Sequence, residues 1–440
     1  MAKILIQGGT VVTMEEEEEE DRLTVIENGE VAVAGPWITH VGRAGTAPAD
    51  FKPDKEINAA GMAVLPGLVN AHTHAAMTLF RGYADDLPLM EWLKEKIWPL
   101  EAKLTKDDIY WGTLLCGLEM IKSGTTTFAD MYFHMNQVAQ AVEKIGMRAS
   151  LSWGLIESPP SSTVGLTLSQ RFAHKWHGAA NNRITVMLGP HAPYTCTPDF
   201  LKKVIKLAQK LKIGIHIHLA ETAQEIEDIK RDYGMTPVQL MNEIKMFEVP
   251  VVAAHCVHLN EEDIAVLAAK KVGVVHNPES NMKLASGIAP VKKMLTAGCL
   301  VGLGTDGAAS NNNQNMWEEM HSAALLQKVA CNDPTALPAH QTFTIATVNG
   351  AKVLGLGKEI GLLKKGYKAD IILVNLQKPH LYPHHDLFAH LVYAAQGSDV
   401  ETVIIDGQLI MENRRVLTVD EEEILFETQK RAVRLIKNTQ

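Results

Sequence analysis

Between residues 63 and 304 the chain repeats one pattern, in which a short apolar run is followed by a longer stretch with helical periodicity. Eight of the apolar runs have the length and composition of buried strands. Eight strand–helix units in one block predict an α/β fold, a (β/α)8 TIM-type barrel. The predicted strands are 63–71, 125–129, 149–155, 184–188, 214–219, 251–254, 272–275 and 300–304, and helix candidates include 107–122, 135–144, 199–211, 236–246 and 261–269.

The two chain ends have a different pattern, in which short strands alternate with turns such as Asn28-Gly29 and Asp406-Gly407. Neither end has enough strands for a sheet of its own, so we expect both to build one small β-sandwich. The predicted domains are residues 1–61 and 359–440 for this sandwich and 62–358 for the barrel. Residues 420–437 should form a C-terminal helix, because acidic residues open it and basic residues close it.

Composition excludes several classes of partner. The net charge of −9 disfavours nucleic acid and anionic membranes, and the acidic run 15–21 is expected to be a solvated loop between two strands. The five cysteines are scattered and never form CxxC pairs, which favours a reducing compartment and argues against a thiolate zinc site. No apolar run approaches the ~20 residues of a membrane span, and the N-terminus lacks signal-peptide features, so we expect a cytoplasmic protein.

Histidines and one aspartate fall at the ends of predicted strands, where the chemistry of such barrels is located. His72 and His74 are two residues apart on a strand, so their imidazoles should point to the same side. Together with His218 and Asp306 they form a candidate metal site, for which zinc is the first expectation and iron or manganese the alternatives. His216 lies one layer deeper and is expected to pack inside the barrel.

Two further residues could carry proton transfer. Glu221 follows His218 at the strand end, where partial burial would raise its pKa and allow it to shuttle protons. His255 is the candidate second base or water-orienting group, and Asp306 is the candidate acceptor of the proton from water. A metal that activates water near pH 7 would suit displacement at an electron-poor carbon beside a ring nitrogen, or hydrolysis of an amide. The segment 184–191 holds no lysine to bridge two metals, which favours one metal per chain.

Several motifs together resemble the amidohydrolase superfamily, and within it the branch of aminohydrolases and triazine hydrolases. The resemblance covers nearly the whole chain, and that family's composite β-sandwich is similar to the two flanking ends. The motifs are PGLVNAHTH at 66–74, GTTT at 124–127, HIHLAE at 216–221, HC at 255–256, VHNPESN at 275–281 and GTDG at 304–307.

The loop 77–93 is typical of deaminases in this branch that act on adenosine derivatives. The resemblance implies hydrolysis of the 6-amino group of 5′-methylthioadenosine and S-adenosylhomocysteine, with Glu221 protonating N1 and ammonia leaving. It also implies that Glu101 receives the ribose hydroxyls, that His191 contacts the substrate, and that Arg148 pairs with the homocysteine carboxylate. Leu89 and Trp92 are expected to wall the pocket, and residues 277–284 its rim.

Alternatives remain at this point. The chain could deaminate another nucleoside or base, such as 5′-deoxyadenosine, adenosine or guanine, or it could be a triazine-type chlorohydrolase. A catalytically silent scaffold is disfavoured, because all the expected metal ligands are present. The ranking of substrates, the metal used in the cell and the oligomeric state stay open, although barrels of this branch commonly form dimers or tetramers.

Overall fold

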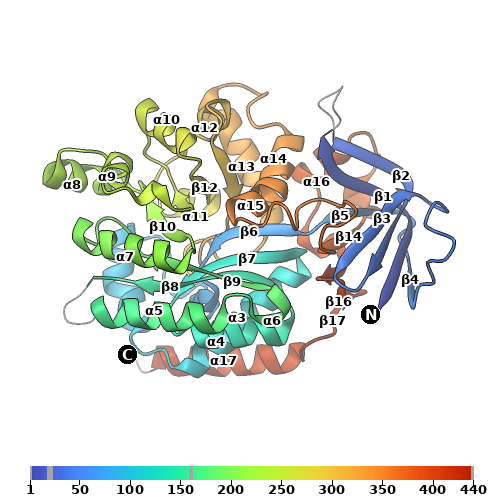
Figure 1. The fold of residues 1–440 in the computed structure, drawn as a ribbon, viewed down its shortest axis with the longest axis horizontal. Helices are drawn as coiled ribbons and strands as arrows, with labels where there is room; N and C mark the ends of the chain where they lie inside the picture. The colour runs from blue at the N-terminus through green and yellow to red at the C-terminus, as the bar shows by residue number, and fades with distance from the viewer. Residues whose placement is uncertain (1, 17–22, 158–161, 438–440) are drawn as a thin grey trace.

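The computed structural model describes residues 2–16, 23–157 and 162–437. Its main unit is a barrel of eight parallel strands in sequential order, with helices around it (Figure 1). The predicted TIM-type barrel is therefore confirmed. Its strands are β6 (Leu68–Thr73), β7 (Thr125–Tyr132), β8 (Arg148–Leu155), β9 (Ile184–Pro190), β10 (Ile215–Leu219), β11 (Val251–His255), β12 (Gly273–His276) and β13 (Leu300–Leu303).

The helices that alternate with these strands begin at side-chain caps. Thr105 and Asp108 form a capping box that opens α3, and Thr197 caps α7 ahead of a proline at its first position. The five helix candidates from the sequence correspond to α3 (Lys106–Lys122), α4 (Met135–Ile145), α7 (Pro198–Leu211), α9 (Pro237–Glu243) and α10 (Glu261–Ala269).

Other helices cover the barrel or lie in its loops. None of the described helices is both long and apolar enough to cross a membrane. The other helical elements are η1 (Ala75–Phe80), α1 (Leu89–Glu91), the π-helical turn η2 (Trp92–Ile97), α2 (Trp98–Glu101), α5 (Ser162–Trp176), α6 (Ala179–Asn182), α8 (Ala223–Tyr233), η3 (Met246–Glu248), α11 (Pro278–Lys283), α12 (Val291–Thr296), α13 (Met316–Cys331), α14 (Ala339–Ala346), α15 (Val348–Val353), η4 (Pro379–Leu381), α16 (Leu387–Tyr393), η5 (Gly397–Asp399) and α17 (Glu421–Lys437).

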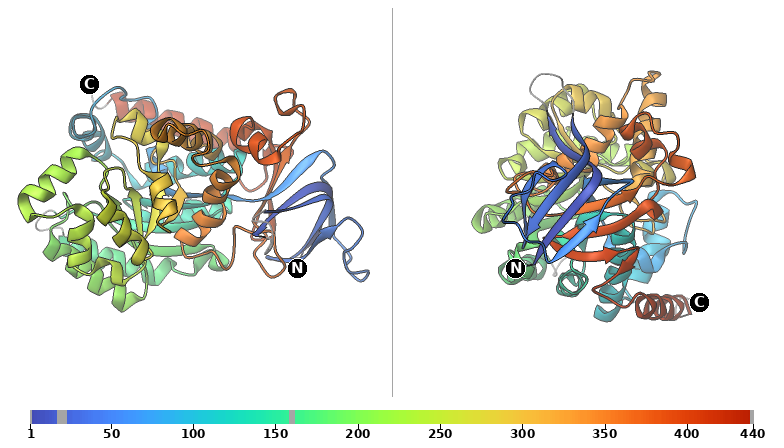
Figure 2. Two further views of the ribbon diagram at one scale, coloured as in Figure 1. Left: turned by 90° about the horizontal axis from the view of Figure 1, so that it is seen from above. Right: turned by 90° about the vertical axis from the view of Figure 1, so that its right-hand side faces the viewer.

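Both chain ends contribute to one mixed sheet beside the barrel, as predicted (Figure 2). It is one continuous nine-stranded sheet, and backbone bonds between Ile38 and the segment 366–367 link its edge strand β3 to the chain just before β14. Its strands are β1 (Lys3–Glu16), β2 (Leu23–Ala34), β3 (Trp37–Arg43), β4 (Lys55–Asn58), β5 (Met62–Pro66), β14 (Ile371–Asn375), β15 (Val400–Ile405), β16 (Gln408–Glu412) and β17 (Arg415–Val416).

Two expectations change at the boundary between these units. The apolar run 63–71 is two strands, because β5 pairs with β1 and β14 in the small sheet and only β6 enters the barrel. Gly67 lies between the two strands. A side chain does not fit there, since a Cβ at this position would lie 2.1 Å from Oγ1 of Thr126. The small sheet therefore includes Met62–Pro66, beyond the predicted boundary at residue 61. The acidic run 15–21 begins at the end of β1, and its residues 17–21 lie outside the described part of the chain.

Candidate active site and metal centre

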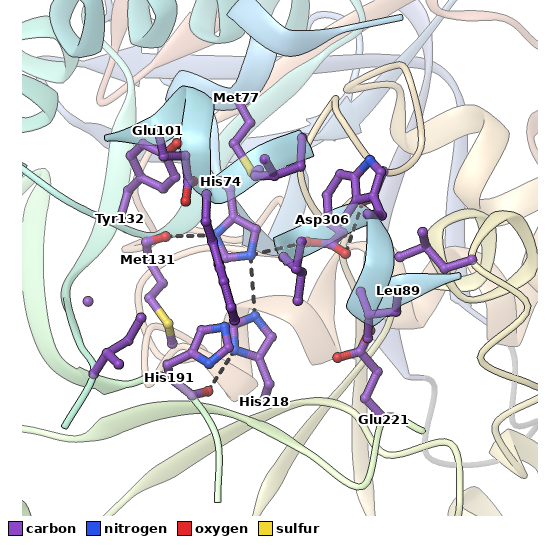
Figure 3. A pocket seen from close by; sticks show the side chains of 18 of the residues that line it. His74, Met77, Leu89, Glu101, Met131, Tyr132, His191, His218, Glu221 and Asp306 are labelled. Carbon is purple, nitrogen blue, oxygen red and sulfur yellow. Dashed lines mark hydrogen bonds and ion pairs between the residues drawn. The ribbon is translucent and has the colours of Figure 1, made fainter. Parts of the chain in front are cut away.

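The carboxyl ends of the barrel strands open into one pocket (Figure 3). The strand ends supply its polar side chains, and the segment 89–101 supplies apolar side chains opposite them. Leu89 and Trp92 are among these, as the sequence predicted. The predicted site residues that line the pocket are His74, Glu101, His191, His218, Glu221, His255 and Asp306.

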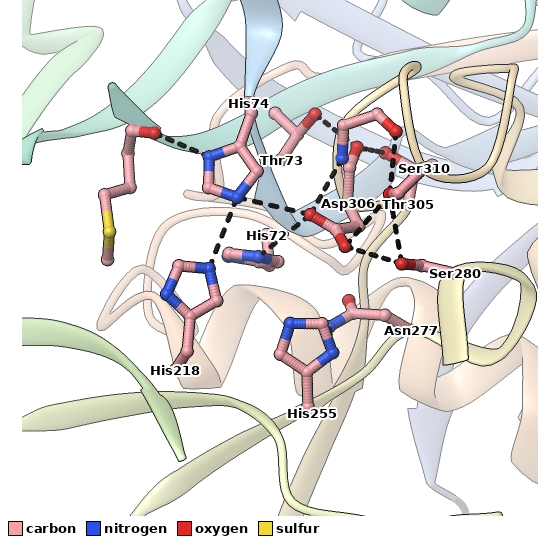
Figure 4. Close-up of polar contacts among 12 residues, drawn as sticks. His72, Thr73, His74, His218, His255, Asn277, Ser280, Thr305, Asp306 and Ser310 are labelled. Atoms are coloured by element: carbon pink, nitrogen blue, oxygen red, sulfur yellow. Dashed lines mark hydrogen bonds and ion pairs between the residues drawn. The ribbon is translucent and has the colours of Figure 1, made fainter. Parts of the chain in front are cut away.

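The four predicted metal ligands converge, with the fully buried His72 beside the other three (Figure 4). Nε2 of His74 lies 3.2 Å from Nε2 of His218 and 3.2 Å from Oδ1 of Asp306, and Nε2 of His72 lies 3.4 Å from the same oxygen. A tetrahedral zinc site with bonds of about 2.0–2.1 Å has edges of about 3.3 Å between its donor atoms. The separations therefore fit the donor set of one metal ion.

The hydrogen bonds on the outer side of each ring orient these donors. Nδ1 of His74 donates to the carbonyl of Met131 over 2.6 Å, and Nδ1 of His218 donates to the carbonyl of His191 over 2.7 Å. In neutral rings these bonds leave the lone pairs on the facing Nε2 atoms. Nε2 of His72 is buried and has no hydrogen-bond partner. Lone pairs aimed at one another in a buried site call for a cation between them.

The charges of the site lead to the same conclusion. Burial lowers the pKa of His72 to about 4 and the pKa of His218 well below its ordinary value, so both rings are neutral. Burial also acts against protonation of His74, but the adjoining Asp306 raises the pKa of His74 to about 9. A proton or a metal ion can therefore supply the positive charge that this position favours.

Asp306 is held by bonds to both of its carboxylate oxygens. Ser280 and Ser310 donate to Oδ2 over 2.6 and 3.1 Å, and the N–H of Gly307 donates to Oδ1 over 2.8 Å. Its backbone has a φ of +61° and donates to the carbonyl of His72 over 3.0 Å. Ser280 lies in the segment 277–284 that was expected to form the rim, so part of this segment lies deeper and supports the metal site.

Glu221 and His255 face the same pocket from neighbouring strand ends. Nε2 of His255 lies 3.9 Å from Oε2 of Glu221, and Oδ1 of Asn281 lies 2.9 Å from Nδ1 of His255. With Nδ1 donating to this amide oxygen, Nε2 is left as an acceptor toward the pocket. Glu221 is 5% exposed, and burial raises its pKa. A buried carboxyl with a raised pKa beside an oriented imidazole can hold and move protons.

Sequence reasoning did not identify Glu225 as a support for Glu221. Its carboxylate accepts the backbone N–H groups of Ala220 and Glu221, each over 2.9 Å. These bonds hold a turn in which Ala220 has a φ of +53°. The sequence did hold one sign of this role, since Glu225 is an acidic residue in the first turn of α8, the helix that follows the motif 216–221. Acidic residues also occur at that position only because they stabilise the helix, so the sign was not specific.

Glu101 enters the pocket from the segment after the first barrel strand. Its Oε1 accepts a hydrogen bond of 2.6 Å from the hydroxyl of Tyr132, a partner that sequence reasoning also missed. Leu93, Ile97 and Glu101 all line the pocket, although they are spaced four residues apart. In a straight α-helix each such step rotates a side chain by about 40°. The π-helical turn Trp92–Ile97 widens the helix and reduces this rotation.

The two remaining histidines have different surroundings. His191 lines the pocket, its Nδ1 lies 3.0 Å from Oγ1 of Thr195, and burial lowers its pKa to about 3. Its neutral side chain is available to a substrate, while its carbonyl orients His218. His216 is buried beneath the site with Nε2 2.8 Å from Nδ1 of His72, which agrees with its expected packing role.

Arg148 is not part of this pocket, which corrects the expectation that it contacts substrate. It begins β8, whereas Gly154 on the same strand lines the pocket, and six residues of strand correspond to about 20 Å. Its guanidinium is 2% exposed and pairs with Asp370 over 2.8 Å and with Asp406 over 3.2 Å. Arg148 therefore joins the lower end of the barrel to the small sheet.

Comparison with known proteins agrees with this geometry. A relative from Pelotomaculum thermopropionicum, named 5-methylthioadenosine/S-adenosylhomocysteine deaminase, is 59% identical over 436 residues, which are 99% of each chain. A relative of the same name from Desulforamulus reducens is 54% identical over 435 residues, again 99% of each chain. A crystal structure of an adenosine deaminase from Xanthomonas campestris with bound zinc has a TM-score of 0.94 at 34% identity and covers 99% of each chain.

The pattern shared by the Amidohydrolase family matches residues 63–410, from the strand before the barrel into the second part of the small sheet. This range includes the four candidate metal ligands and both proton-transfer candidates. With relatives of this identity over its full length, the chain belongs to the amidohydrolase family of metal-dependent hydrolytic enzymes.

Proposed function

We propose that this protein is a hydrolytic deaminase that converts the 6-amino group of 5′-methylthioadenosine and S-adenosylhomocysteine to the inosine analogues and releases ammonia. The observation that carries the proposal is one pocket with the metal ligands and Glu221 at its base and the Glu101–Tyr132 pair at another wall. A ring amine and a ribose diol are the two groups that such a pocket recognises. The names of the relatives from Pelotomaculum and Desulforamulus support the same substrates.

We propose zinc as the metal, one ion per chain, held by His72, His74, His218 and Asp306, with iron and manganese as alternatives. The donor set of imidazoles and a carboxylate is one that zinc prefers. When bound, the ion supplies Lewis-acid activation of water near pH 7. The zinc in the Xanthomonas adenosine deaminase supports this choice.

The side chains of this chain divide the proton transfers among them. Glu221 gives a proton to N1 of the purine, which makes C6 electron-poor, and it can do so because its raised pKa keeps a proton available. Asp306 accepts the proton of the attacking water, and His255 orients that water through Nε2. As the water oxygen bonds to C6, the C6–N bond breaks, and the amine takes up the proton held by Asp306 to leave as ammonia, while N1 keeps the proton from Glu221.

The substrate contacts follow from the same pocket. A single carboxylate can accept hydrogen bonds from both hydroxyls of a vicinal diol, and Glu101 is 2.6 Å from the Tyr132 hydroxyl that orients it. His191, which also lines the pocket, contacts the purine or the ribose, and Asp306 lies near C6. Guanine and triazines lack the diol, so they would leave Glu101 unused. Adenosine remains a candidate, which the Xanthomonas relative favours.

The experiment that tests the proposal mixes zinc-loaded protein with 5′-methylthioadenosine and follows the ultraviolet spectrum. An adenine-to-hypoxanthine shift with one equivalent of ammonia is the expected outcome. Parallel assays with S-adenosylhomocysteine, adenosine, guanine and a chlorinated triazine distinguish the alternatives. If the spectra of all adenosine derivatives stay unchanged while chloride or guanine turnover occurs, the proposal is wrong.

We propose that the enzyme is cytoplasmic and forms a homodimer, or a tetramer that contains this dimer. The five cysteines are free, which suits a reducing compartment. Helix α17 presents an apolar stripe to solvent, with Leu425, Phe426, Val433 and Ile436 exposed by 55%, 67%, 40% and 38%. These four side chains lie on one side of the helix, while Ile424, Thr428 and Leu435 on its other side are buried.

Charge favours a second copy as the occupant of this stripe. An antiparallel pair of α17 helices would bring the acidic first turn Glu421–Glu423 of one copy beside Lys437 of the other. Light scattering should give the mass of a dimer or tetramer for the wild type and of a monomer for Phe426→Glu/Val433→Glu. Val164→Glu, which changes an exposed apolar residue on α5, is the matched control. A monomeric wild type refutes the assembly.

A further inference from the structure

A second cavity adjoins the pocket on the side of Glu101. Four residues line both cavities, namely Trp98, Glu101, Phe133 and Ile156, so the two spaces share one wall region. None of the candidate metal ligands borders the second cavity. We refer to this second cavity as the side chamber, and its other lining residues are Ala102, Leu104, Ile109, His134, Trp153 and Thr195.

The position of the side chamber matches one part of the proposed substrate. With C6 of the purine at the metal site and the ribose diol at Glu101, the remaining group of the nucleoside is the substituent on C5′. C5′ is attached to C4′, the ring carbon beside C3′, and C3′ carries one hydroxyl of the diol, so the substituent begins close to Glu101. The side chamber is the space that adjoins Glu101 there.

The walls of the side chamber are suited to an uncharged group. Aromatic and aliphatic side chains such as Trp153, Leu104 and Ile109 make up most of its lining. Among the described residues, no lysine or arginine lines either the pocket or the side chamber. Burial and the neighbouring Lys106 lower the pKa of His134, so this ring is neutral as well. A carboxylate placed against these walls would lose part of its hydration without gaining a cationic partner among the lining residues.

The arginine expected to fill that role is committed elsewhere. Arg148 forms a buried pair with Asp370 and Asp406 at the other end of β8. It cannot reach the side chamber without breaking this pair and leaving the buried carboxylate of Asp370 without a cationic partner.

We propose that the side chamber receives the 5′ substituent of the nucleoside and selects uncharged, apolar thioethers over substituents that carry a carboxylate and an ammonium group. This rests on the proposed deaminase function and ranks its two substrates. 5′-Methylthioadenosine and longer alkylthioadenosines are the preferred class, and S-adenosylhomocysteine is the poorer substrate.

The test compares kcat/KM of the zinc-loaded wild type for a series of thioethers. 5′-Propylthioadenosine is S-adenosylhomocysteine without its amine and carboxylate, so this pair isolates the charges. We expect kcat/KM to rise up to about fourfold for each methylene buried between methylthio and propylthio. We expect S-adenosylhomocysteine to fall at least about tenfold below the propylthio compound.

A variant with a cation in the shared wall should reverse this preference. In Ile156→Arg, the ratio of kcat/KM for S-adenosylhomocysteine to that for propylthioadenosine should rise at least about tenfold. Ile156→Met is the matched control and should keep the apolar preference, because it preserves volume without charge. Leu104→Arg places the charge on another wall of the side chamber if Ile156→Arg does not fold.

The outcomes separate the two proposals. If the wild type deaminates S-adenosylhomocysteine as well as or better than propylthioadenosine, the apolar selection is wrong while the deaminase function stands. If none of the thioadenosines is deaminated, the proposed function itself fails. An unchanged ratio in a folded Ile156→Arg or Leu104→Arg variant places the 5′ substituent outside the side chamber and also overturns the inference.

Discussion

The side chain of Asn70 forms hydrogen bonds to Thr305 across the seam of the barrel, which is the junction between its first strand β6 and its last strand β13. Its Nδ2 donates to Oγ1 of Thr305 over 2.7 Å, and its Oδ1 accepts the backbone N–H of Thr305 over 3.1 Å. Among the described strands no β-ladder joins β6 to β13, so these bonds stand where ladder bonds would otherwise lie. Thr305 immediately precedes Asp306, and the seam therefore sets where the carboxylate ligand meets His72 and His74.

The first prediction concerns this seam. Asn70→Ala should lower the free energy of unfolding by about 1–3 kcal/mol, because it leaves the buried backbone N–H of Thr305 without its acceptor. It should also reduce zinc content, since Asp306 loses its support. Chemical denaturation and metal analysis measure the two effects. A double-mutant cycle with Thr305→Ala should show coupling, and additive effects would mean that the pair does not act as one unit.

The second prediction concerns the metal. Removal of zinc by a chelator should abolish deamination reversibly and lower the melting temperature, because a ligand that binds only the folded state at 1,000 times its Kd contributes about 4 kcal/mol. Asp306→Asn should reduce zinc content in the same way. His258→Asn is the control, since His258 bonds to the carbonyl of Ser286 over 2.6 Å instead. Calorimetry that shows equal stability with and without zinc would contradict the metal site.

The third prediction separates Glu221 from the ligands. Glu221→Gln should keep zinc bound and keep the fold, yet lower kcat by about 10²–10⁴, because the amide cannot transfer a proton to N1. Metal analysis and steady-state kinetics on the same preparation provide the measurement. Loss of zinc in this variant would show that Glu221 is a ligand and not a proton donor.

The fourth prediction concerns Glu101 and pH. Glu101→Gln should lower kcat/KM for 5′-methylthioadenosine about 10-fold to 100-fold, because bonds to a charged acceptor contribute about 1.5–3 kcal/mol. Burial raises the pKa of Glu101, and only the ionised form accepts both hydroxyls. KM of the wild type should therefore increase as the pH falls toward that raised pKa.

The control for Glu101 is a substrate without the diol. 2′,3′-Dideoxyadenosine should react equally slowly with wild type and Glu101→Gln, and its KM should lack this acidic increase. If the variant discriminates against the dideoxy substrate as strongly as the wild type does, Glu101 does not bind the ribose.

The fifth prediction follows from the corrected position of Arg148. Arg148→Met should destabilise the protein by about 3–5 kcal/mol, because Asp370 would lose its buried cationic partner, while Asp406 keeps only Lys368 at 3.4 Å. The ratio of KM values for S-adenosylhomocysteine and 5′-methylthioadenosine should not change. Arg171→Met, at an exposed position on α5, serves as the control for loss of an arginine. A selective KM increase for S-adenosylhomocysteine at unchanged stability would restore Arg148 to the substrate site.

Local patterns in the sequence identified the strand-end residues. The spacing of His72 and His74 predicted that both imidazoles point to the same side of a strand. The position of Glu221 after His218 predicted that its carboxyl group faces the pocket. These inferences are short in range, since strand alternation and strand order bring such residues to one edge of a barrel. The eight barrel strands were identified for the same reason.

Tertiary structure alone decided which partners support those residues and which carboxylates pair with Arg148. Asn281 on His255, Ser280 on Asp306 and Tyr132 on Glu101 come from other elements, and no local pattern specifies these contacts. Arg148 stands at the start of β8, and only the folded structure shows that Asp370 and Asp406, from the small sheet, are its partners. By itself the sequence therefore determined the chemistry of the site, because that depends on residue type and short spacing. The tertiary structure decided the side chamber beside Glu101 and the contact of Asn70 with Thr305, because both depend on segments that meet only after folding.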